Sequence, residues 1–583
     1  MSFVNTTFTF GTRIVPDPAL VLLGSLCSEQ ERVLHKHLAQ GGKLDQATKY
    51  AVMTETGLPG RFYNGITTML DGKHKAVREL TKLRVTEVSE RIKQINKKII
   101  QLENDAKKLA ADPRAKRAAK RIGNIKLAIH GKKRKSYNLN LRLMRLKKEM
   151  DASVPTLCFG SKKLFRRQFA LSENGYNSHA EWLKEWQRVR GSQFMVPGSH
   201  DEVSGNMTCM SSVEEDGSVS LRLLIPETLR VDGRKYAVFN HIRFGYGHAE
   251  VVAAINAANA QHPVVAAYQA QTKRDVATLV AENTELDAEH LSKQVKTLRR
   301  ERNSASKIVR DGHTTALTWR FVRDSTGWTA FVSLHRRLAV ADWDFIHGAL
   351  GVDLNVGFLS ITPVDGSGNP LKSLAVDLPI ETAALSSDRA KAVLGDAVAL
   401  VVQMALDQRR PIIIEDLDFV KKKAALKETV SPNLRRRLSS FSYNLVKTML
   451  HSRAVRFGVC VIEVNPAYTS HMGRAKYATP LGISVHRAAA AMIARRGMGL
   501  SEGLFTSAEL PLGDGRHVAL HRPVRIGRKH VWVSWGKHFG RYKAARNALV
   551  KADRKVRSVE ARNLAQAGNP ASKRCKLTLH QVG

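Results

Sequence analysis

The sequence predicts a multidomain α+β protein, in which a helical region is inserted into β-rich sequence and an α/β domain follows. Residues 2–16 alternate β-forming side chains up to Pro16, residues 17–152 carry a helical pattern, and residues 153–348 return to short β-forming runs. Over residues 349–583, apolar strands alternate with helical sequence. A chain of 583 residues is long enough for several domains, each with its own core.

The β-forming run over residues 2–16 has no partner nearby in the sequence, so distant sequence must complete its sheet. Four further strands are predicted, and the last two are joined by the turn sequence Asp324-Ser325-Thr326-Gly327. These strands are residues 218–225, 235–244, 315–322 and 328–334. An insertion over about 249–310 is Ala-rich at first and then charged and helical, and we expect solvent-exposed packing for it.

A heptad pattern predicts long paired helices within residues 17–152. Apolar residues recur at alternating spacings of three and four, at Val85, Val88, Ile92, Ile95, Ile99, Leu102, Ala106 and Leu109. Asp112-Pro113 then turns the chain, and a returning apolar stripe begins at Ile122. Because the turn is short, an antiparallel hairpin packed on itself is favoured over an intermolecular coiled coil.

The returning helix is strongly cationic, and no Asp or Glu occurs from Arg114 through Lys148. A run of charge is usually a solvated face. One so one-sided, on a folded helical pair, favours contact with nucleic-acid phosphates. The candidate phosphate contacts are Arg114, Lys116, Arg117, Lys120, Arg121, Lys132, Lys133, Arg134 and Lys135.

The composition of the whole chain points to a polyanionic partner. Lys and Arg total 93 against 52 Asp and Glu, which gives a net charge of +41. A ribosome-associated or chromatin-like protein would explain this charge, but it would not explain the acids at the strand ends of the last domain. Five cysteines without a C-x-x-C pair are typical of a reducing compartment and exclude a four-cysteine zinc ribbon. Because neither a signal peptide nor a bilayer-length apolar run is visible, we expect a soluble cytoplasmic protein that binds no membrane.

Two carboxylates follow buried strands of the last domain. The isoleucines at 412–414 run into Glu415, and Gly351-Val352 runs into Asp353. A helix is predicted over 390–406, between these two strands. One such acid alone is more often an ordinary strand-end residue, but two of them could share Mg²⁺, which favours oxygen ligands.

Two cationic triplets follow Glu415 closely. Positive charge there suits a nucleic-acid strand that passes the metal site, and a solvated linker is the alternative. The triplets are Lys421, Lys422 and Lys423, and Arg435, Arg436 and Arg437.

Aromatic and basic residues also interleave near the C-terminus. Such residues can hold a single strand by stacking, whereas core packing is the reading we favour for at least two of the aromatics. The aromatics are Trp532, Trp535, Phe539 and Tyr542, and the basic residues are Arg522, Arg525, Arg528, Lys529 and Lys537.

Three motifs of the last domain together resemble a known family. A G-[IV]-D strand at Asp353, an [IV]-E-[DN]-L strand at Glu415 and the V-x-P-x-x-T-S segment at 464–470 occur in that order. They resemble the RuvC-like domain of the TnpB and type V CRISPR effector superfamily. The resemblance implies an RNase H-like fold that cuts DNA with two metals held by Asp, Glu and Asp, with Asp353 as the first acid and Glu415 as the second.

The third acid of that pattern is missing. Where the family has a D-x-N-A-A-x-N-I helix start, this chain has His486, followed by the alanines at 488–491 and Ile493. No carboxylate occurs between Glu463 and Glu502. Many TnpB relatives carry a zinc ribbon between the Thr-Ser motif and the third acid. In this chain only residues 469–474 occupy that place, which is too short for a ribbon, so no zinc site is expected.

The resemblance also assigns the remaining domains. It implies that residues 17–152 are a helical recognition lobe that grips the guide–target duplex. Residues 1–16 together with 153–348 would form a β-barrel wedge domain for the guide's repeat-derived handle, with a strand and turn over 157–165. Residues 349–583 would be the RuvC-like domain.

The compact chain with a degenerate metal site looks most like the type V-M effectors, which bind target DNA and block transcription without cutting it. The resemblance then implies a CRISPR guide RNA and complementary double-stranded DNA with a short flanking motif as partners, in a prokaryotic cytoplasm. One Mg²⁺, or Mn²⁺, is the expected metal, and the oligomeric state stays open.

Other functions remain open at the level of sequence. Imidazole ligates Mg²⁺ weakly and Mn²⁺ better, so an endonuclease with weak or residual RuvC activity, such as guide-precursor processing, is one alternative. A transposon-derived regulator that uses a guide is another. A DNA-binding protein without an RNA partner is the third.

Overall fold

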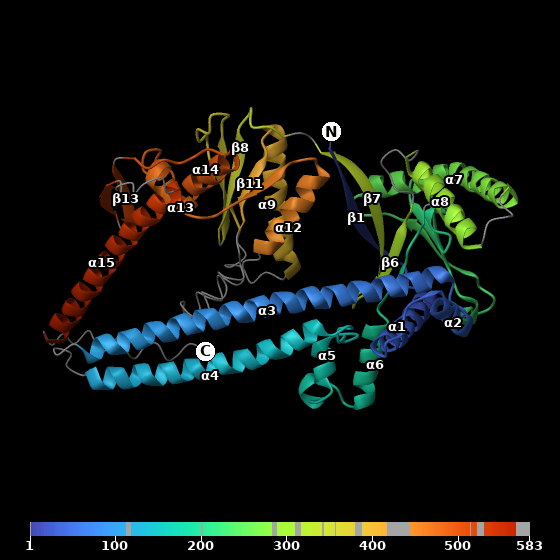
Figure 1. Ribbon diagram of the computed structural model, residues 1–583, viewed down its shortest axis with the longest axis horizontal. Coiled ribbons are helices and arrows are strands. Elements are labelled where there is room, and N and C mark those ends of the chain that lie inside the picture. The colour runs from blue at the N-terminus through green and yellow to red at the C-terminus, as the bar shows by residue number, and fades with distance from the viewer. Residues whose placement is uncertain are drawn as a thin grey trace. The chain divides into compact units, whose positions relative to one another are not determined.

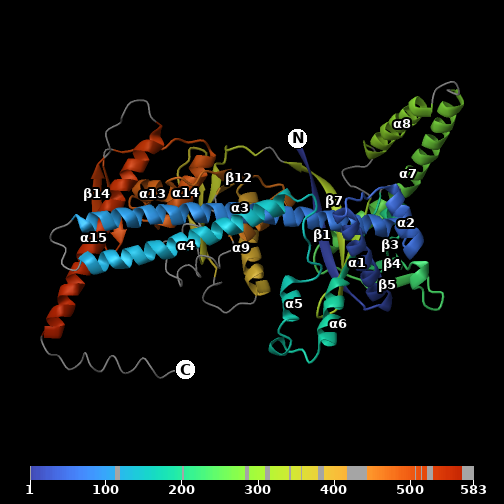
Figure 2. The ribbon, with the colours of Figure 1, turned by 60° about the horizontal axis from the view of Figure 1, so that its bottom comes forward.

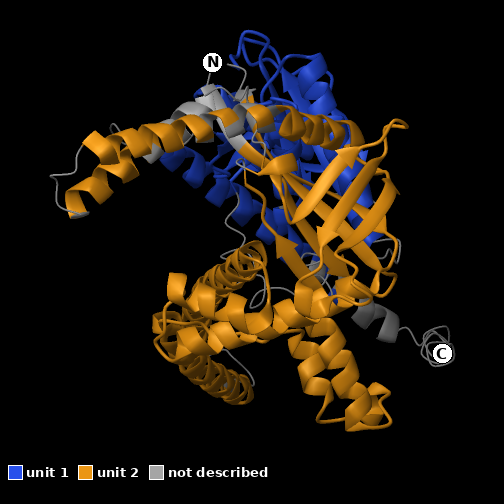
Figure 3. Cartoon of the chain, turned by 90° about the vertical axis from the view of Figure 1, so that its right-hand side faces the viewer, with its two compact units in different colours: residues 1–2, 339–583 blue, residues 3–338 orange. Residues whose placement is uncertain are grey.

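The computed structural model describes most of the chain (Figure 1). The described residues are 2–111, 118–199, 202–282, 288–308, 316–340, 343–355, 357–378, 387–416, 443–505, 507–513, 515–521 and 530–566. The chain forms two compact units, residues 3–338 and residues 339–583 with 1–2 (Figure 3). No helix in the described part of the chain carries an apolar stretch long enough to cross a membrane.

The 3–338 unit contains two antiparallel-strand systems around one core. One sheet has the order β1-β7-β6-β2, and the other has the order β3-β4-β5. Their bounds are β1 (Ser2–Ile14), β2 (Gln193–Val196), β3 (Cys209–Val213), β4 (Val219–Leu224), β5 (Tyr236–Ile242), β6 (Thr318–Arg323) and β7 (Trp328–Val340). The expected strands are therefore present, and β1 is completed by distant sequence, as predicted. The hydroxyls of Thr9 on β1 and Ser333 on β7 lie 3.2 Å apart.

The expected closed β-barrel is wrong for the described residues, because their strands form two sheets that do not join into one ring. The side chain of Asn206, which is fully buried, bridges the junction. Its Nδ2 donates to the carbonyl oxygens of Val196 (3.0 Å) and Leu317 (2.9 Å), at the ends of β2 and β6. Its Oδ1 accepts from the amides of Thr208 (3.1 Å) and Cys209 (2.9 Å), at the start of β3. One amide group thus satisfies the backbone groups that a continuous strand ladder would have paired.

The helices of this unit surround the sheets and extend away from them. Their bounds are α1 (Pro18–Ala39), α2 (Gln46–Thr56), α3 (Gly60–Ala110), α4 (Ala118–Asp151), α5 (Lys162–Arg167), α6 (His179–Arg190), α7 (His248–Glu282) and α8 (Ala288–Ile308). Short 3₁₀ turns lie at η1 (Ser172–Asn174), η2 (Val203–Gly205) and η3 (Glu227–Leu229). The insertion near 249–310 is helical, as expected.

Helices α3 and α4 form the predicted hairpin and run side by side (Figures 1 and 2). Their seam buries Val88, Ile92, Ile95 and Ile99 of α3 against Leu139 and Leu146 of α4. Ser136 donates to Asn96 across the pair (3.1 Å). The turn between them, residues 112–117, lies outside the described residues.

The strand and turn expected over 157–165 are wrong in part, because α5 begins at Lys162. The Ser161 hydroxyl accepts from the amide of Leu164 (3.4 Å) and caps the helix. Gly160 precedes this cap with φ +96°, a left-handed conformation that ends any extended run. The Ser161 cap therefore favours a helix from Lys162 onward, although the composition of this segment favours a strand.

The 339–583 unit is built on a five-stranded sheet of order β10-β9-β8-β11-β12. Strands β10, β9 and β8 are antiparallel neighbours, whereas β8, β11 and β12 are parallel. The strand bounds are β8 (Ala349–Asn355), β9 (Phe358–Val364), β10 (Leu374–Asp377), β11 (Ile412–Glu415) and β12 (Val461–Val464). A two-stranded sheet of β13 (Ser507–Gly513) and β14 (Arg516–His521) follows.

Helices cover both faces of the five-stranded sheet. Leu350, Val352, Ile412 and Ile414 pack on one face against α9 and α12, whereas Ile413 packs on the other face against α14. The helix bounds are α9 (Ser387–Asp407), α12 (Tyr443–Arg456), α13 (Thr469–Gly473), the π-helix η4 (Arg474–Ala478), α14 (Val485–Gly497) and α15 (Val531–Gln566). The helix expected over 390–406 is thus present as α9.

Helix α14 lies very close to β8. A Cβ atom at Gly351 would lie 1.9 Å from the carbonyl oxygen of Ala490, so only glycine permits this approach. The alanines at 488–491 are fully buried, and their small side chains let the helix pack closely against the sheet. Thr362 of β9 also donates to the carbonyl oxygen of Arg487 (2.8 Å), which fixes the first turn of the helix.

Candidate functional site

The two strand-end acids lie at the same level of the sheet. Strands β8 and β11 are adjacent and parallel, and their pairing ends at Val352 and Ile414. Asp353 and Glu415 are each one residue further along. Because side chains alternate along a strand, both point to the face that carries α14. The sheet thus brings together two carboxylates that are 62 positions apart in the sequence, since 415 − 353 = 62.

His486 reaches this pair from the first turn of α14. Its Nδ1 lies 3.3 Å from Oδ2 of Asp353, and the Nδ2 of Asn355 donates to the same oxygen (2.9 Å). Asp353 is 7% exposed, whereas the His486 side chain is 49% exposed and meets the Phe358 ring edge-on at 5.1 Å. The imidazole therefore occupies the position beside Asp353 at the solvent side of the site.

A threonine of the V-x-P-x-x-T-S segment holds Glu415. The motif alone did not predict this role. The Thr469 hydroxyl donates to Oε1 of Glu415 (2.5 Å) and is itself buried. Tyr468 precedes it with φ 64°, a left-handed conformation that is rare for a residue with a side chain. Such strain is typical of functional sites, and here it presents the hydroxyl to the acid.

A positive charge also acts on Glu415. Arg496, in the last turn of α14, is half-buried, and burial lowers the pKa of its guanidinium, while the charges of Glu415 and Glu502 act to raise it. Arg496 donates to the carbonyl oxygen of Asn465 and lies 5.1 Å from the centre of the Trp532 ring. No pattern in the sequence points to this residue beyond the general excess of arginine.

The acids that come before and after His486 in the sequence have partners of their own. Glu463 on β12 faces α12, where it pairs with Lys447 (2.5 Å) and His451 (2.9 Å). Glu502 is buried and pairs with Lys476 and Arg495. The first turn of α14 contains no acidic residue. Both flanking carboxylates are thus engaged with cations away from Asp353 and Glu415.

The chemistry of the donors fits one hard divalent cation. Asp353 and Glu415 offer carboxylate oxygens, and His486 offers a nitrogen that Mg²⁺ disfavours and Mn²⁺ accepts better. The three side chains are not drawn together as a closed ligand cage. Within the described residues, only Glu214, Asp216 and His241 have such atoms all within 4.8 Å of one another.

The predicted phosphate contacts divide into placed and unplaced residues. On α4, Lys120, Arg121, Lys133 and Arg134 are exposed, and Lys132 and Lys135 are half-buried. Lys133 pairs with Glu103 of α3 (3.2 Å). The other candidates lie outside the described residues: Arg114, Lys116, Arg117, Lys421, Lys422, Lys423, Arg435, Arg436 and Arg437.

The aromatics of α15 belong mainly to a core. Trp535 and Tyr542 are buried, and Trp532 and Phe539 pack partly against the same cluster. The indole of Trp535 donates to the carbonyl oxygen of Glu502 (2.8 Å). The prediction that at least two of these aromatics pack in the core is confirmed.

Comparisons with known proteins give little beyond this geometry. No protein-family model and no curated protein matches the chain. Among solved structures, the chain is similar to the Cas12i1 R-loop complex before target DNA cleavage, at 9% identity and a TM-score of 0.15 over 66% of this chain and 53% of that chain. It is also similar to the Cas12i1–crRNA binary complex, at 10% identity and a TM-score of 0.16 over 82% of this chain and 49% of that one. The chain thus spans about half the length of these effectors, and TM-scores in this range do not establish a shared fold.

Proposed function

We propose that this chain is an RNA-guided protein that binds complementary double-stranded DNA and blocks transcription without cutting it, like the type V-M CRISPR effectors. The observation that carries this proposal is the site at the ends of β8 and β11. Two carboxylates lie side by side there, and His486 lies 3.3 Å from Asp353 where the family pattern has an acid. The sheet of three antiparallel and two parallel strands, with α9 and α12 on one face, supports an RNase H-like assignment for this unit.

Charge explains why such a site would bind metal and fail to cleave. A two-metal nuclease needs ligands for two dications, which stabilise the attacking and the leaving oxygen. Asp353, Glu415 and an acid would supply three negative charges, whereas Asp353, Glu415 and neutral His486 supply two. The site would hold one Mg²⁺ through Asp353 and Glu415, and that ion would supply Lewis-acid polarisation of a phosphate. A second ion lacks a carboxylate.

Binding would be carried by other parts of the chain. In guided recognition, base pairing between guide and target reads the sequence, and the protein contacts the backbone. The cations of α4 suit that task, because no acid interrupts them from Lys120 to Lys148. A protein bound in this way obstructs polymerase without any chemical step.

The test is to purify the full chain, sequence its bound RNA and assay target DNA. We expect one small RNA species with a repeat-derived segment, and tight binding of a matching duplex that stays intact with Mg²⁺ present. Recovery of heterogeneous ribosomal or messenger fragments alone would contradict the guided function. A mismatched duplex is the matched control for guide-dependent binding.

A second candidate is a metal-dependent nuclease of low activity, for instance toward the guide precursor. The contact between His486 and Asp353 favours it, since an imidazole beside a carboxylate can ligate Mn²⁺. Steady accumulation of cut target with Mn²⁺ at stoichiometric protein would establish this function and refute the non-cleaving one.

A further inference from the structure

A small helical module follows the long hairpin and has a core of its own. Helices α5 and α6 pack through Leu164, Tyr176, Trp182 and Trp186, and the two tryptophans stack at 5.7 Å. The indole of Trp182 donates to the carbonyl oxygen of Leu164 (2.9 Å), which ties the two helices together. The module therefore presents its surface side chains from a fixed frame.

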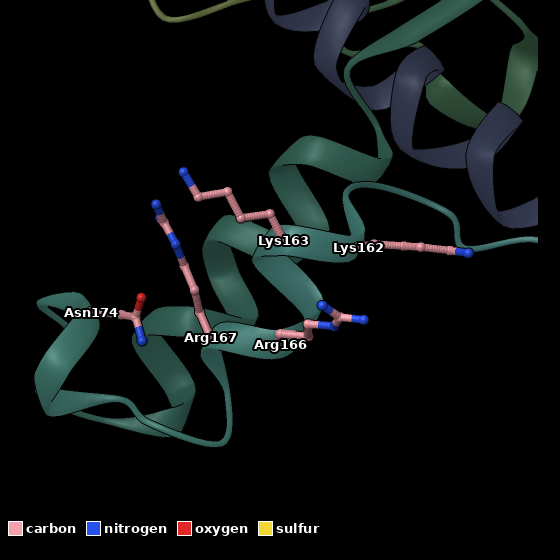
Figure 4. Close-up of a pocket in the computed structure, with 5 residues that line it drawn as sticks. All are labelled: Lys162, Lys163, Arg166, Arg167 and Asn174. Carbon is pink, nitrogen blue, oxygen red and sulfur yellow. The ribbon is translucent and has the colours of Figure 1, made fainter. Parts of the chain in front are cut away.

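One surface of this module is a cationic hollow of about 410 Å³, shown in Figure 4. Lys162, Lys163, Arg166, Arg167 and Asn174 line it. Because side chains four residues apart share a helix face, Lys163 and Arg167 form one pair and Lys162 and Arg166 another. Figure 4 shows Lys163 and Arg167 extending to the same side.

The charges of this hollow lack compensation within the described residues. None of the four cations pairs with a described carboxylate. Arg167 Nη1 donates to the Tyr176 hydroxyl (3.4 Å), which itself donates to Glu185 (2.7 Å), and the buried Nε of Arg167 has no described hydrogen-bond partner. Four like charges around one hollow repel one another, so an anion bound there would remove that repulsion. Phosphate suits such a group, because arginine can donate two parallel hydrogen bonds to it and lysine attracts it as a point charge.

Exposed aromatics border the cations. Phe165 and Phe169 are 43% and 76% exposed, and their rings meet edge-on at 6.0 Å. They form a third pair with the same four-residue spacing, next to the cationic pairs around α5. Basic side chains beside exposed aromatic rings are the arrangement that holds unpaired nucleotides, because every base offers a face for stacking.

Asn174 favours RNA over DNA as the occupant. Its Nδ2 donates to the carbonyl oxygen of Ala170 (2.6 Å), which leaves Oδ1 as an acceptor. The four cations only donate, so Asn174 alone among the lining side chains can accept a hydrogen bond. A ribose 2′-hydroxyl supplies a matching donor, and deoxyribose has none.

We propose that the α5–α6 module holds an unpaired nucleotide of RNA, with phosphate in the cationic hollow, the base on Phe165 and Phe169, and the 2′-hydroxyl on Asn174. That this RNA is the guide rests on the proposed function. The site itself rests only on the module's side chains.

The test measures the affinity of the full chain for an oligouridine of about 12 nucleotides and for an oligodeoxyuridine of the same length. Lys162→Ala with Arg166→Ala should weaken RNA binding about tenfold more than the control pair Lys184→Ala with Arg188→Ala. The control removes one Lys and one Arg of the same spacing from exposed positions of α6. Phe169→Ala should weaken binding of either oligonucleotide roughly five- to 150-fold, the effect of one lost stacking contact.

Asn174→Ala distinguishes the two nucleic acids. We expect it to weaken oligouridine roughly two- to tenfold and to leave oligodeoxyuridine unchanged. Equal effects of the two cation pairs would overturn the site, and equal effects of Asn174→Ala on both oligonucleotides would overturn the assignment to RNA. If the site passes while the purified chain carries no guide, the proposed function fails and this inference stands. If the purified chain carries a guide while the α5–α6 variants bind RNA like their controls, this inference is wrong and the proposed function stands.

Discussion

The α3–α4 hairpin and the five-stranded sheet handle charge in opposite ways. Along α4, cations cover the faces outside the apolar seam, and the sequence supplies no acid between Ala118 and Lys148. In the sheet, each acid has a neighbour that holds it, as Asn355 and His486 hold Asp353 and as Thr469 holds Glu415. Helix α4 thus carries a long stretch of cations with no acid of its own, although Glu103 of α3 pairs with Lys133. The sheet instead places both Asp353 and Glu415 beside polar partners.

This difference indicates two separate tasks. A row of cations without intervening acids is suited to a long polyanion, whereas a pair of oriented carboxylates is suited to a small cation. The two features belong to different compact units, so a change in one should leave the property of the other intact. Each of the following experiments asks whether that separation holds.

The largest effect is expected from charge reversal on the hairpin. Lys120→Glu, Arg121→Glu and Lys126→Glu together should lower RNA affinity on the order of a hundredfold and reduce the log–log salt slope by roughly two to three. Divalent-metal binding should stay unchanged. Filter binding over a salt series measures the slope.

The matched control for the hairpin reverses Lys273, Arg274 and Lys296, which are exposed on α7 and α8. These three residues have the same composition but lie outside the acid-free stretch. If they weaken RNA binding as much as the hairpin variant does, the net charge of the chain decides affinity and the hairpin has no special part.

A second effect should appear as acid sensitivity of the 339–583 unit. Burial among aromatics, with His538, Arg474 and Lys543 nearby, lowers the pKa of His471 from 6.5 to about 3. In the unfolded chain this imidazole takes up a proton near pH 6.5, and in the folded chain it resists protonation until about pH 3. The unfolded state thus binds more protons between these values. The free energy of unfolding should therefore fall by up to about 1.4 kcal/mol per pH unit as pH decreases from 6.5.

Urea unfolding at a series of pH values measures this dependence. His471→Leu should flatten it, and His530→Leu, at an exposed position, should not. An unchanged slope in His471→Leu would place the acid sensitivity in other groups, such as the His35–His74 pair of the 3–338 unit, whose pKa values burial also lowers.

The smallest effect concerns the metal site. His486→Asp adds a third carboxylate and should raise divalent-metal affinity about tenfold and confer weak target cleavage. The new anion also lies in the first turn of α14, where it is favourable. RNA affinity should not change, and Asp353→Ala should leave guide-directed DNA binding nearly intact.

The same substitution elsewhere provides its control. His451→Asp places a carboxylate beside Glu463, but Lys447 already neutralises that acid, so no gain is expected. Calorimetric titration of Mn²⁺ and Mg²⁺ compares the two variants. Identical metal binding in wild type and His486→Asp would show that His486 does not stand in the third ligand position.

Regular patterns in the sequence predicted the elements that carry these features. Three isoleucines before Glu415 predicted its buried strand, and the heptad stripe of α3 predicted the hairpin seam. The distant partner of β1 was also expected. In each case, a periodic apolar pattern specifies which face is buried, and burial is the main determinant of position.

The features that sequence did not predict depend on single polar groups. Asn206 joins two sheets where a barrel was expected, Ser161 starts a helix where a strand was expected, and Thr469 holds Glu415. A lone amide or hydroxyl produces no periodic pattern. Its partner is set by the tertiary structure, so its role becomes visible only with the fold.

The close approach of α14 to Gly351 limits which substitutions this chain can accept during evolution. Gly351 and Asp353 lie on one face of β8, and Ala490 and His486 lie one helical turn apart on α14, so the glycine contact holds His486 beside Asp353. This backbone contact does not depend on which side chain stands at position 486. Histidine and aspartate codons differ by a single nucleotide. Under the proposed function, one point mutation at this position would then restore the acid, and a substitution at Gly351 would displace α14 and remove that route.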